Sequence, residues 1–290
     1  MLSSDEFHSK RQYADTNFGR IAYVEQGSGP VALYIHGALL NGYQWRHQLA
    51  DLADIRRGIA LDTLGMGYTQ AKPEQSLDIS NQAAMIATFL DVLDIEQVDL
   101  VGNDSGGGIA QIFAAKYPKR IRSLTITNAE VVGFTENNPT LDQFRASVEN
   151  GMLTTNIKAA LTDPAAAQAG LATAYEFPAK VSPATIQHYF HPLVENIERE
   201  QMMRDYLLAI SDEQLQATKD QLKALAAPAM ILWGNADLFF PTDLAYWLRD
   251  NLANVKIFEE LEGGKLFFPE EHPKWLNQHL RNFWETNSKH

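Results

Sequence analysis

The segment with the clearest chemical signal is a short glycine-rich stretch that contains an aspartate. It reads Val-Gly-Asn-Asp-Ser-Gly-Gly-Gly over residues 101–108, between a predicted strand and a predicted helix. Gly102 and Gly106 flank Asp104 at the spacing of a tight strand-to-helix turn that exposes its central side chain as a nucleophile. Small residues are needed at both flanks because such a turn brings two backbone segments close together. We therefore predict that Asp104 is a nucleophile.

The same stretch can be read one residue later, with a serine as the nucleophile. Ser105 would then stand between Asn103 and Gly107. Asparagine is larger than the residue that this flanking position favours, so Asp104 is preferred. A glycine-rich turn can also bind phosphate or have no chemical role. The motifs that follow argue against both of these alternatives.

Alternating strands and helices must hold this turn in place. Apolar runs predict strands and helical periodicity predicts helices, after an N-terminal hairpin around Asn17–Gly19. The predicted strands are 31–37, 57–62, 98–104, 121–129, 229–237 and 255–264, and the predicted helices are 42–54, 79–95, 105–118 and 271–286. This alternation predicts an α/β protein with a mostly parallel, doubly wound sheet.

A helical block interrupts the alternation. Residues 131–222 are rich in Ala, Gln and Glu, and several prolines divide them into short helices. We predict that this block is a helical lid, or cap domain, inserted into one core domain. The core domain would comprise residues 1–130 and 223–290.

Composition excludes several classes of function. The formal net charge of −12 disfavours nucleic acid and anionic membrane partners. With no cysteine, disulfides, thiolate metal sites and cysteine nucleophiles are excluded. No signal peptide and no run of about 18 apolar residues is visible, so we expect a cytoplasmic location and no membrane partner. We expect a small-molecule substrate, no cofactor and no metal; the sequence does not indicate an oligomeric state.

The motifs together resemble the α/β-hydrolase superfamily over nearly the whole chain. His36-Gly37-Ala38 resembles its oxyanion loop, Asp62-Thr63-Leu64-Gly65-Met66-Gly67 resembles its structural D-x-x-G-x-G turn, and Trp233-Gly234-Asn235-Ala236-Asp237 resembles its acid loop. The resemblance implies an α/β-hydrolase fold with an eight-stranded sheet and an inserted helical lid. It also implies an oxyanion hole from the backbone N–H groups of Ala38 and Ser105, with His36 in a structural role.

The same resemblance implies which carboxylate completes the catalytic triad. It makes Asp237 the triad acid. Glu130 is an alternative acid, because some dehalogenases of the superfamily carry the acid after this strand. We favour a different interpretation for Glu130, as a carboxylate at the start of a helix that enters the lid.

With an aspartate as the predicted nucleophile, the chain resembles haloalkane dehalogenases, fluoroacetate dehalogenases and epoxide hydrolases. In these enzymes the carboxylate attacks carbon, and an activated water then hydrolyses the ester. Dehalogenases commonly have tryptophan where this chain has Ser105, and asparagine where it has Ala38. Epoxide hydrolases use lid tyrosines as acids, and the predicted lid contains Tyr175, Tyr189 and Tyr206, which are more often packing residues.

A lysine stands where the resemblance implies the catalytic histidine. The motif G-G-H reads Gly263-Gly264-Lys265 in this chain. A lysine has an ordinary pKa of about 10.4 and cannot accept a proton near neutral pH. We expect the Lys265 ammonium to bridge Asp104 and Asp237, which leaves the site without a general base. We expect the other candidate histidines to be packing or surface residues: His188, His191 and His272.

Three functions remain open on this reasoning. The first is a hydrolase with Asp104 as nucleophile, acting on a C–halogen, epoxide or ester bond. The second is a non-hydrolytic lyase, decarboxylase or isomerase, with Asp104 as base and Lys265 as a binder of a carbonyl or carboxylate. The third is a ligand-binding pseudoenzyme that lacks the catalytic histidine.

Overall fold

One mixed sheet forms the centre of the molecule. The computed structural model describes residues 2–287. The strand order is β1-β2-β4-β3-β6-β7-β8-β9, with β5 paired to β2. The strands are β1 (Gln12–Thr16), β2 (Gly19–Gln26), β3 (Val31–Ile35), β4 (Arg57–Leu61), β5 (Gln70–Ala71), β6 (Val98–Asp104), β7 (Ile121–Ala129), β8 (Ala229–Gly234) and β9 (Val255–Leu261). Strands from β4 to β9 along this order pair in parallel, and the pairs that involve β1, β2 and β5 are antiparallel.

Helices cover both faces of the sheet. The α-helices are α1 (Ser4–Ser9), α2 (Arg46–Asp51), α3 (Ile79–Val92), α4 (Ser105–Lys116), α5 (Pro139–Glu149), α6 (Met152–Ala160), α7 (Pro164–Leu171), α8 (Pro183–Val194), α9 (Ile197–Ala209), α10 (Asp212–Lys223), α11 (Thr242–Asn251), α12 (Phe268–Glu271) and α13 (Pro273–Asn287). Three 3-10 turns accompany them: η1 (Gly42–Trp45), η2 (Pro118–Arg120) and η3 (Pro178–Lys180). Helix α4 packs on β6 and β7 and is flanked by α3 and α10, whereas α2 packs against β4 and α13.

The central strands form because their residues can be buried on both faces. Every residue of β3 and β6 is buried, as parallel strands covered by helices on both sides require. The predicted α/β-hydrolase fold with its mostly parallel sheet is therefore confirmed. The two-residue strand β5 is an addition that the sequence did not indicate.

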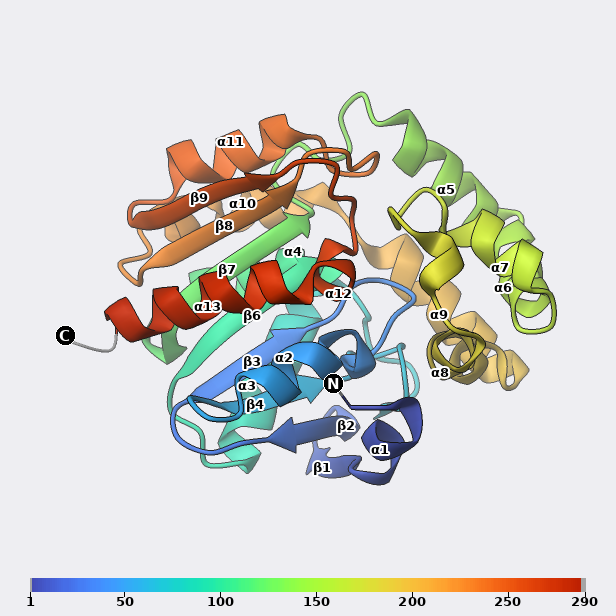
Figure 1. The fold of residues 1–290 in the computed structure, drawn as a ribbon, viewed down its shortest axis with the longest axis horizontal. Coiled ribbons are helices and arrows are strands. Elements are labelled where there is room, and N and C mark those ends of the chain that lie inside the picture. The colour runs from blue at the N-terminus through green and yellow to red at the C-terminus, as the bar shows by residue number, and fades with distance from the viewer. Residues whose placement is uncertain (1, 288–290) are drawn as a thin grey trace.

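Helices α5 to α9 lie apart from the two helical layers. Figure 1 shows them, in green to gold, grouped beyond one end of the strands. Helix α10 instead packs along α4, so the helices beyond the sheet end with α9. We refer to α5–α9 as the helical insertion. Among residues 2–287, no helix is long and apolar enough to cross a membrane.

Candidate active site

Asp104 lies on a strained turn at the end of the most buried part of the sheet. It is the last residue of β6 and directly precedes α4, with φ 56° and ψ −131°. A side chain at Gly102 would collide with the carbonyl oxygen of Gly106, and one at Gly106 would collide with that of Ile35. These close approaches explain why the sequence has glycine on both sides. Non-glycine residues rarely adopt such a backbone, and strain of this kind is concentrated at functional sites.

Backbone N–H groups hold the Asp104 carboxyl group. The N–H of Ala38 donates to Oδ2 over 2.8 Å, and the N–H of Ser105 also stabilises the ionised form. Asp104 is buried, with only 6% of its surface exposed. Burial raises the pKa of Asp104 to about 8, the charge of Asp237 adds to this, and the two N–H groups oppose it. The carboxyl group is therefore mostly protonated at neutral pH.

A buried histidine fixes the loop that carries Ala38. The backbone N–H of Thr63 donates to His36 Nε2 over 3.0 Å. Because Nε2 is an acceptor, Nδ1 carries the hydrogen and donates to the carbonyl oxygen of Gly37 over 2.7 Å. Burial lowers the pKa of His36, so the ring stays neutral. Both ring nitrogens are engaged in hydrogen bonds to loop backbone groups, so His36 has a structural role and does not transfer protons.

Two buried amides, whose pairing no sequence pattern indicates, connect this loop to the turn. Gln44 Oε1 accepts from the backbone N–H of Gly37 over 2.9 Å, and Gln44 Nε2 donates to Asn103 Oδ1 over 2.6 Å. Asn103 Nδ2 donates in turn to the carbonyl oxygen of Leu266 over 3.0 Å. The amide pair therefore holds together three loops around Asp104, which explains an asparagine at this position.

Asp237 lies after β8 in a dense set of hydrogen-bond donors. Asn128 Nδ2 donates to its Oδ2 over 2.8 Å, and the N–H of Phe239 donates to its Oδ1 over 2.9 Å. Burial nevertheless raises the pKa of Asp237 to about 7. Strands β6, β7 and β8 are parallel neighbours, so residues that follow their carboxyl ends gather at one edge of the sheet.

Glu130 directly follows β7, the strand between β6 and β8, and it does not begin a helix. The segment after β7 is a series of turns, and α5 begins only at Pro139, so the interpretation of Glu130 as a helix-start carboxylate was wrong. The residue is 3% exposed, and its Oε2 atom has no hydrogen-bond partner within residues 2–287. Burial, together with the charge of Asp104, raises the pKa of Glu130 well above its ordinary value.

Lys265 does not form the ion bridge expected from the sequence. Its Nζ atom donates to the backbone carbonyl oxygen of Ala172, just after α7, over 2.7 Å. No ion pair between described residues includes Lys265. The N–H of Phe267 donates to the carbonyl of Ala174 over 3.1 Å in the same region. Lys265 thus ties the loop after β9 to the helical insertion.

The next residue of this loop, Leu266, faces the site instead. Leu266 lines the same cavity as Asp104, and Lys265 is absent from the described residues around that cavity. Leu266 is only 4% exposed. Phe267, the following residue, also lines the cavity, so this part of the cavity wall consists of apolar side chains that cannot accept a proton.

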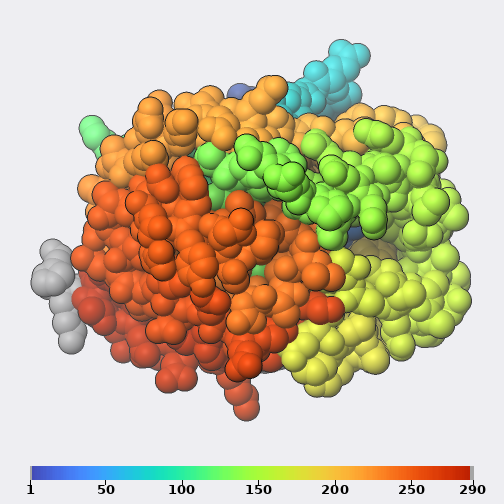
Figure 2. Space-filling view, turned by 90° about the horizontal axis from the view of Figure 1, so that it is seen from above, coloured from blue at the N-terminus to red at the C-terminus, as the bar shows by residue number. Residues whose placement is uncertain are grey.

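The cavity has a volume of about 430 Å³. Its walls are mostly apolar and come from the helical insertion and the loops at the end of the sheet; they include Leu141, Phe144, Ile157, Leu171, Phe190 and Phe240. Figure 2 shows a hollow on the surface where green and yellow-green residues of the insertion meet. Asp104 and Glu130 are the carboxyl groups of the described chain that line this cavity.

The remaining candidate histidines do not supply a base to the cavity. His188 is buried beside the rings of Phe7 and Tyr43, and burial lowers its pKa to about 3. His272 Nε2 contacts Glu176 Oε2 at 2.6 Å, and His191 is exposed. These three residues are not among the described residues that line the cavity.

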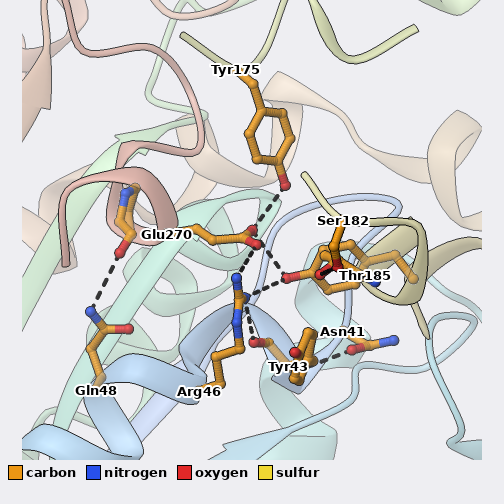
Figure 3. A network of polar contacts seen from close by, with 10 residues as sticks. Asn41, Tyr43, Arg46, Gln48, Tyr175, Ser182, Thr185 and Glu270 are labelled. Carbon is orange, nitrogen blue, oxygen red and sulfur yellow. Dashed lines mark hydrogen bonds and ion pairs between the residues drawn. The ribbon is translucent and has the colours of Figure 1, made fainter. Parts of the chain in front are cut away.

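Two tyrosines of the expected lid are committed to a buried glutamate. Tyr175 and Tyr189 donate to Glu270 Oε2 over 2.9 Å and 3.0 Å. Arg46 Nη2 pairs with Glu270 Oε1 at 2.7 Å. Figure 3 shows the phenol of Tyr175 and the guanidinium of Arg46 converging on this carboxylate. The network joins the helical insertion to the core, and it leaves neither hydroxyl proton free for a substrate.

The third tyrosine, Tyr206 of α9, contacts the turn itself. Its hydroxyl donates to Ser105 Oγ over 2.8 Å, and both residues are fully buried. Ser105 is the first residue of α4, and the positive φ belongs to Asp104. The local geometry therefore presents Asp104 to the cavity and encloses the serine hydroxyl.

Comparison with known proteins places this fold in a family. A family model described as alpha/beta hydrolase fold matches residues 30–272. The 2-hydroxy-6-oxo-2,4-heptadienoate hydrolase of Pseudomonas putida is 34% identical over 111 residues, which are 37% of this chain and 40% of that protein. The chain thus aligns with about 40% of the length of the first curated relatives.

Two further similarities extend along almost the whole chain. The cis-3-alkyl-4-alkyloxetan-2-one decarboxylase of Shewanella oneidensis is 23% identical over 287 residues, covering 94% of this chain and 88% of that protein. The structure of the epoxide hydrolase CorEH superposes with a TM-score of 0.79 at 21% identity, covering 95% of this chain and 98% of that one. At that identity the structural match reports the fold. The chain belongs to the alpha/beta hydrolase fold family.

Proposed function

We propose that this chain is a hydrolase in which the Asp104 carboxylate attacks a carbon atom of a small, largely apolar electrophile. The observation that carries the proposal is the hydrogen bond from Ala38 N–H to Asp104 Oδ2 on a strained turn inside an apolar cavity. With Oδ2 held, Oδ1 is the oxygen available to attack. The attack would form an ester between Asp104 and the substrate.

The same N–H groups support the second half of the reaction. When water adds to the carbonyl carbon of such an ester, negative charge develops on one carboxyl oxygen. The Ala38 and Ser105 N–H groups already donate to this carboxyl group, and preorganised donors stabilise such a charge without rearrangement. The hydrolase names of relatives also support hydrolysis.

Alkylation of Asp104 is the first testable consequence. We expect 1-bromohexane to add one hexyl group to the wild-type protein, because bromide leaves without needing a proton. The rate should rise about tenfold per pH unit below pH 8 and then level off, since Asp104 attacks only when ionised. Intact-mass measurements over time at pH 6 to 9 give this rate.

The matched control is Asp104→Asn, which keeps the shape of the side chain but removes the attacking carboxylate. It should gain no hexyl group, and peptide mapping of the wild type should place the added mass on Asp104. If the wild type forms neither adduct nor product with bromohexane, epoxyhexane or activated esters, the hydrolase proposal is wrong and a ligand-binding pseudoenzyme is the better description.

A second candidate function, non-hydrolytic cleavage, is favoured by one comparison. The relative that aligns along 94% of this chain is named as an oxetan-2-one decarboxylase. Loss of carbon dioxide from such a ring consumes no water, so it needs no base for water activation, and no imidazole of the described chain lines this cavity. The version of this candidate in which Lys265 binds a carbonyl group of the substrate loses its support, because the Lys265 ammonium group donates a hydrogen bond to the backbone carbonyl of Ala172.

An oxetan-2-one with two alkyl chains distinguishes the two candidates. Decarboxylation would release an alkene and carbon dioxide, whereas hydrolysis would give a hydroxy acid. Gas chromatography of the products formed by the wild type and by Asp104→Asn measures both. Hydroxy acid as the sole enzymatic product would contradict the second candidate.

A further inference from the structure

Building on the proposed function, we infer that Glu130 is a further catalytic residue, a carboxylic acid that protonates the departing oxygen of an epoxide. The substrate class of the site would then be three-membered cyclic ethers in preference to alkyl halides. Glu130 would also replace the absent histidine in the second step, because the carboxylate left behind after proton donation can accept a proton from water.

The position of Glu130 carries this inference. Glu130 and Asp104 line the same cavity, at the carboxyl ends of the adjacent parallel strands β7 and β6. Glu130 is 3% exposed, and its Oε2 has no partner within the described chain. A buried polar atom without a partner is costly in free energy. Oε2 itself lies fully buried near Gly108 of α4, so Glu130, which lines the cavity, would meet the substrate oxygen through its other carboxyl oxygen, Oε1.

Other proton donors near the cavity are already engaged. The hydroxyl groups of Tyr175 and Tyr189 donate to Glu270, and that of Tyr206 donates to Ser105. Arg145 lines the cavity, but its guanidinium donates to the carbonyl of Ile210 and does not release a proton near neutral pH. Among the described titratable residues of the cavity wall, Glu130 is the acid left beside the nucleophile.

The hydrogen bonds also decide which carboxyl group keeps the proton. Asp104 receives N–H bonds from Ala38 and Ser105 that favour its ionised form. Glu130 Oε2 receives none, and burial with the charge of Asp104 raises the pKa of Glu130 despite a hydrogen bond from its own backbone N–H. Of these two neighbours, Asp104 therefore ionises first while Glu130 stays protonated. Tyr206, which also interacts electrostatically with Glu130, has a raised pKa from burial and stays neutral.

The first step opens the ring. Asp104 Oδ1 forms a bond to a ring carbon, and the bond between that carbon and the ring oxygen breaks. The bonding electron pair moves to the ring oxygen, which takes the proton of Glu130. The products of this step are a hydroxyalkyl ester on Asp104 and an ionised Glu130.

The second step releases the diol. Ionised Glu130 takes a proton from water as the water oxygen adds to the ester carbon, and the oxyanion forms on Oδ2 at the Ala38 and Ser105 N–H groups. The ester C–O bond then breaks, and the departing oxygen takes the proton back from Glu130. The second proton of the water, now on the Asp104 carboxyl group, then passes to ionised Glu130. The net reaction is epoxide plus water to diol, with Asp104 ionised and Glu130 protonated as at the start.

Alkyl halides would follow only the first half of this scheme. A departing halide takes no proton, so Glu130 remains an acid after the ester has formed and cannot activate water near neutral pH. We therefore expect the hexyl ester from 1-bromohexane to persist at pH 7, whereas 1,2-epoxyhexane, with the same carbon chain, is turned over.

The test compares these two probes on the wild type, Glu130→Gln and Asp104→Asn, by intact mass and by diol formation. Glu130→Gln should still be alkylated by bromohexane, which shows that Asp104 and the cavity are intact. Its turnover of epoxyhexane should fall by about 100-fold, the usual contribution of a positioned acid. Equal epoxide turnover by the wild type and Glu130→Gln would overturn the assignment of Glu130.

A second readout needs no variant. Epoxide opening requires ionised Asp104 and protonated Glu130, so the wild-type rate should pass through a maximum with pH. Alkylation by bromohexane requires only ionised Asp104, and its rate should rise to a plateau. Parallel pH profiles would overturn the role of Glu130 even if Glu130→Gln failed to fold. Failure of the proposed function itself gives a different result, namely no Asp104 adduct with either probe.

Discussion

Replacing Leu266 with histidine should accelerate hydrolysis of the hexyl ester on Asp104 by about 100-fold or more at pH 7. Leu266 lines the cavity with Asp104, so an imidazole there would lie close enough to activate water. A positioned general base contributes about 10²–10⁴-fold. The side chains of leucine and histidine are similar in size, and the carbonyl of Leu266 would keep its hydrogen bond from Asn103.

Lys265→His is the matched control, and it should leave ester hydrolysis unchanged. The Lys265 side chain extends to the carbonyl of Ala172, so an imidazole at this position would lie outside the cavity. The measurement is the loss of the hexyl adduct by intact mass after excess bromohexane is removed, with Leu266→Gln as a polar, non-basic variant. Faster hydrolysis in Lys265→His than in Leu266→His would mean that the loop presents the lysine to the substrate after all.

The sheet and the turn around Asp104 could be predicted because both depend on local patterns. Strands β3 and β6 are both fully buried, and β3 is a continuous apolar run. The turn requires Gly102 and Gly106 for steric reasons that the spacing of the glycines already expresses. Local constraints of this kind are present in the sequence itself.

The direction of side chains in the loop after β9 could not be obtained from spacing alone. A loop has no fixed periodicity, so a shift of one residue exchanges Lys265 for Leu266 at the cavity wall. The usable signal was chemical. Burial of an unpaired ammonium group is costly and burial of leucine is favourable, so of two adjacent residues the leucine is the better candidate for the buried position.

Long-range polar contacts were also beyond the reach of the sequence. Gln44 contacts Asn103 across 59 residues of chain, and Tyr175 contacts Glu270 across 95. Neither pair has a spacing that marks it. Glu130 was recognised as a possible acid, but its unpartnered oxygen depends on the turns that follow β7, and these turns have no distinctive sequence pattern.

The buried carboxyl group of Asp104 should make the folded protein less stable as the pH rises. The pKa of Asp104 is about 8 in the folded protein and about 3.9 in an unfolded chain. The folded state therefore binds the proton more tightly. Below about pH 4 the carboxyl group is protonated in both the folded and the unfolded state, so it does not lower the free energy of unfolding. Between about pH 4 and 8 each pH unit lowers the free energy of unfolding by about 1.4 kcal/mol, and above pH 8 the loss is complete.

Asp104→Asn should remove this loss, because the amide does not ionise and its oxygen can still accept from Ala38 N–H. The variant should match the wild type near pH 4 and exceed it by roughly 3–5 kcal/mol at pH 8, as measured by urea unfolding. Asp94→Asn is the control, since Asp94 is exposed and has a similar φ of 53°. It separates the backbone preference of asparagine from the loss of charge. A stability gain in Asp104→Asn that does not change with pH would mean that strain on the turn, and not the buried charge, limits the stability of the wild type.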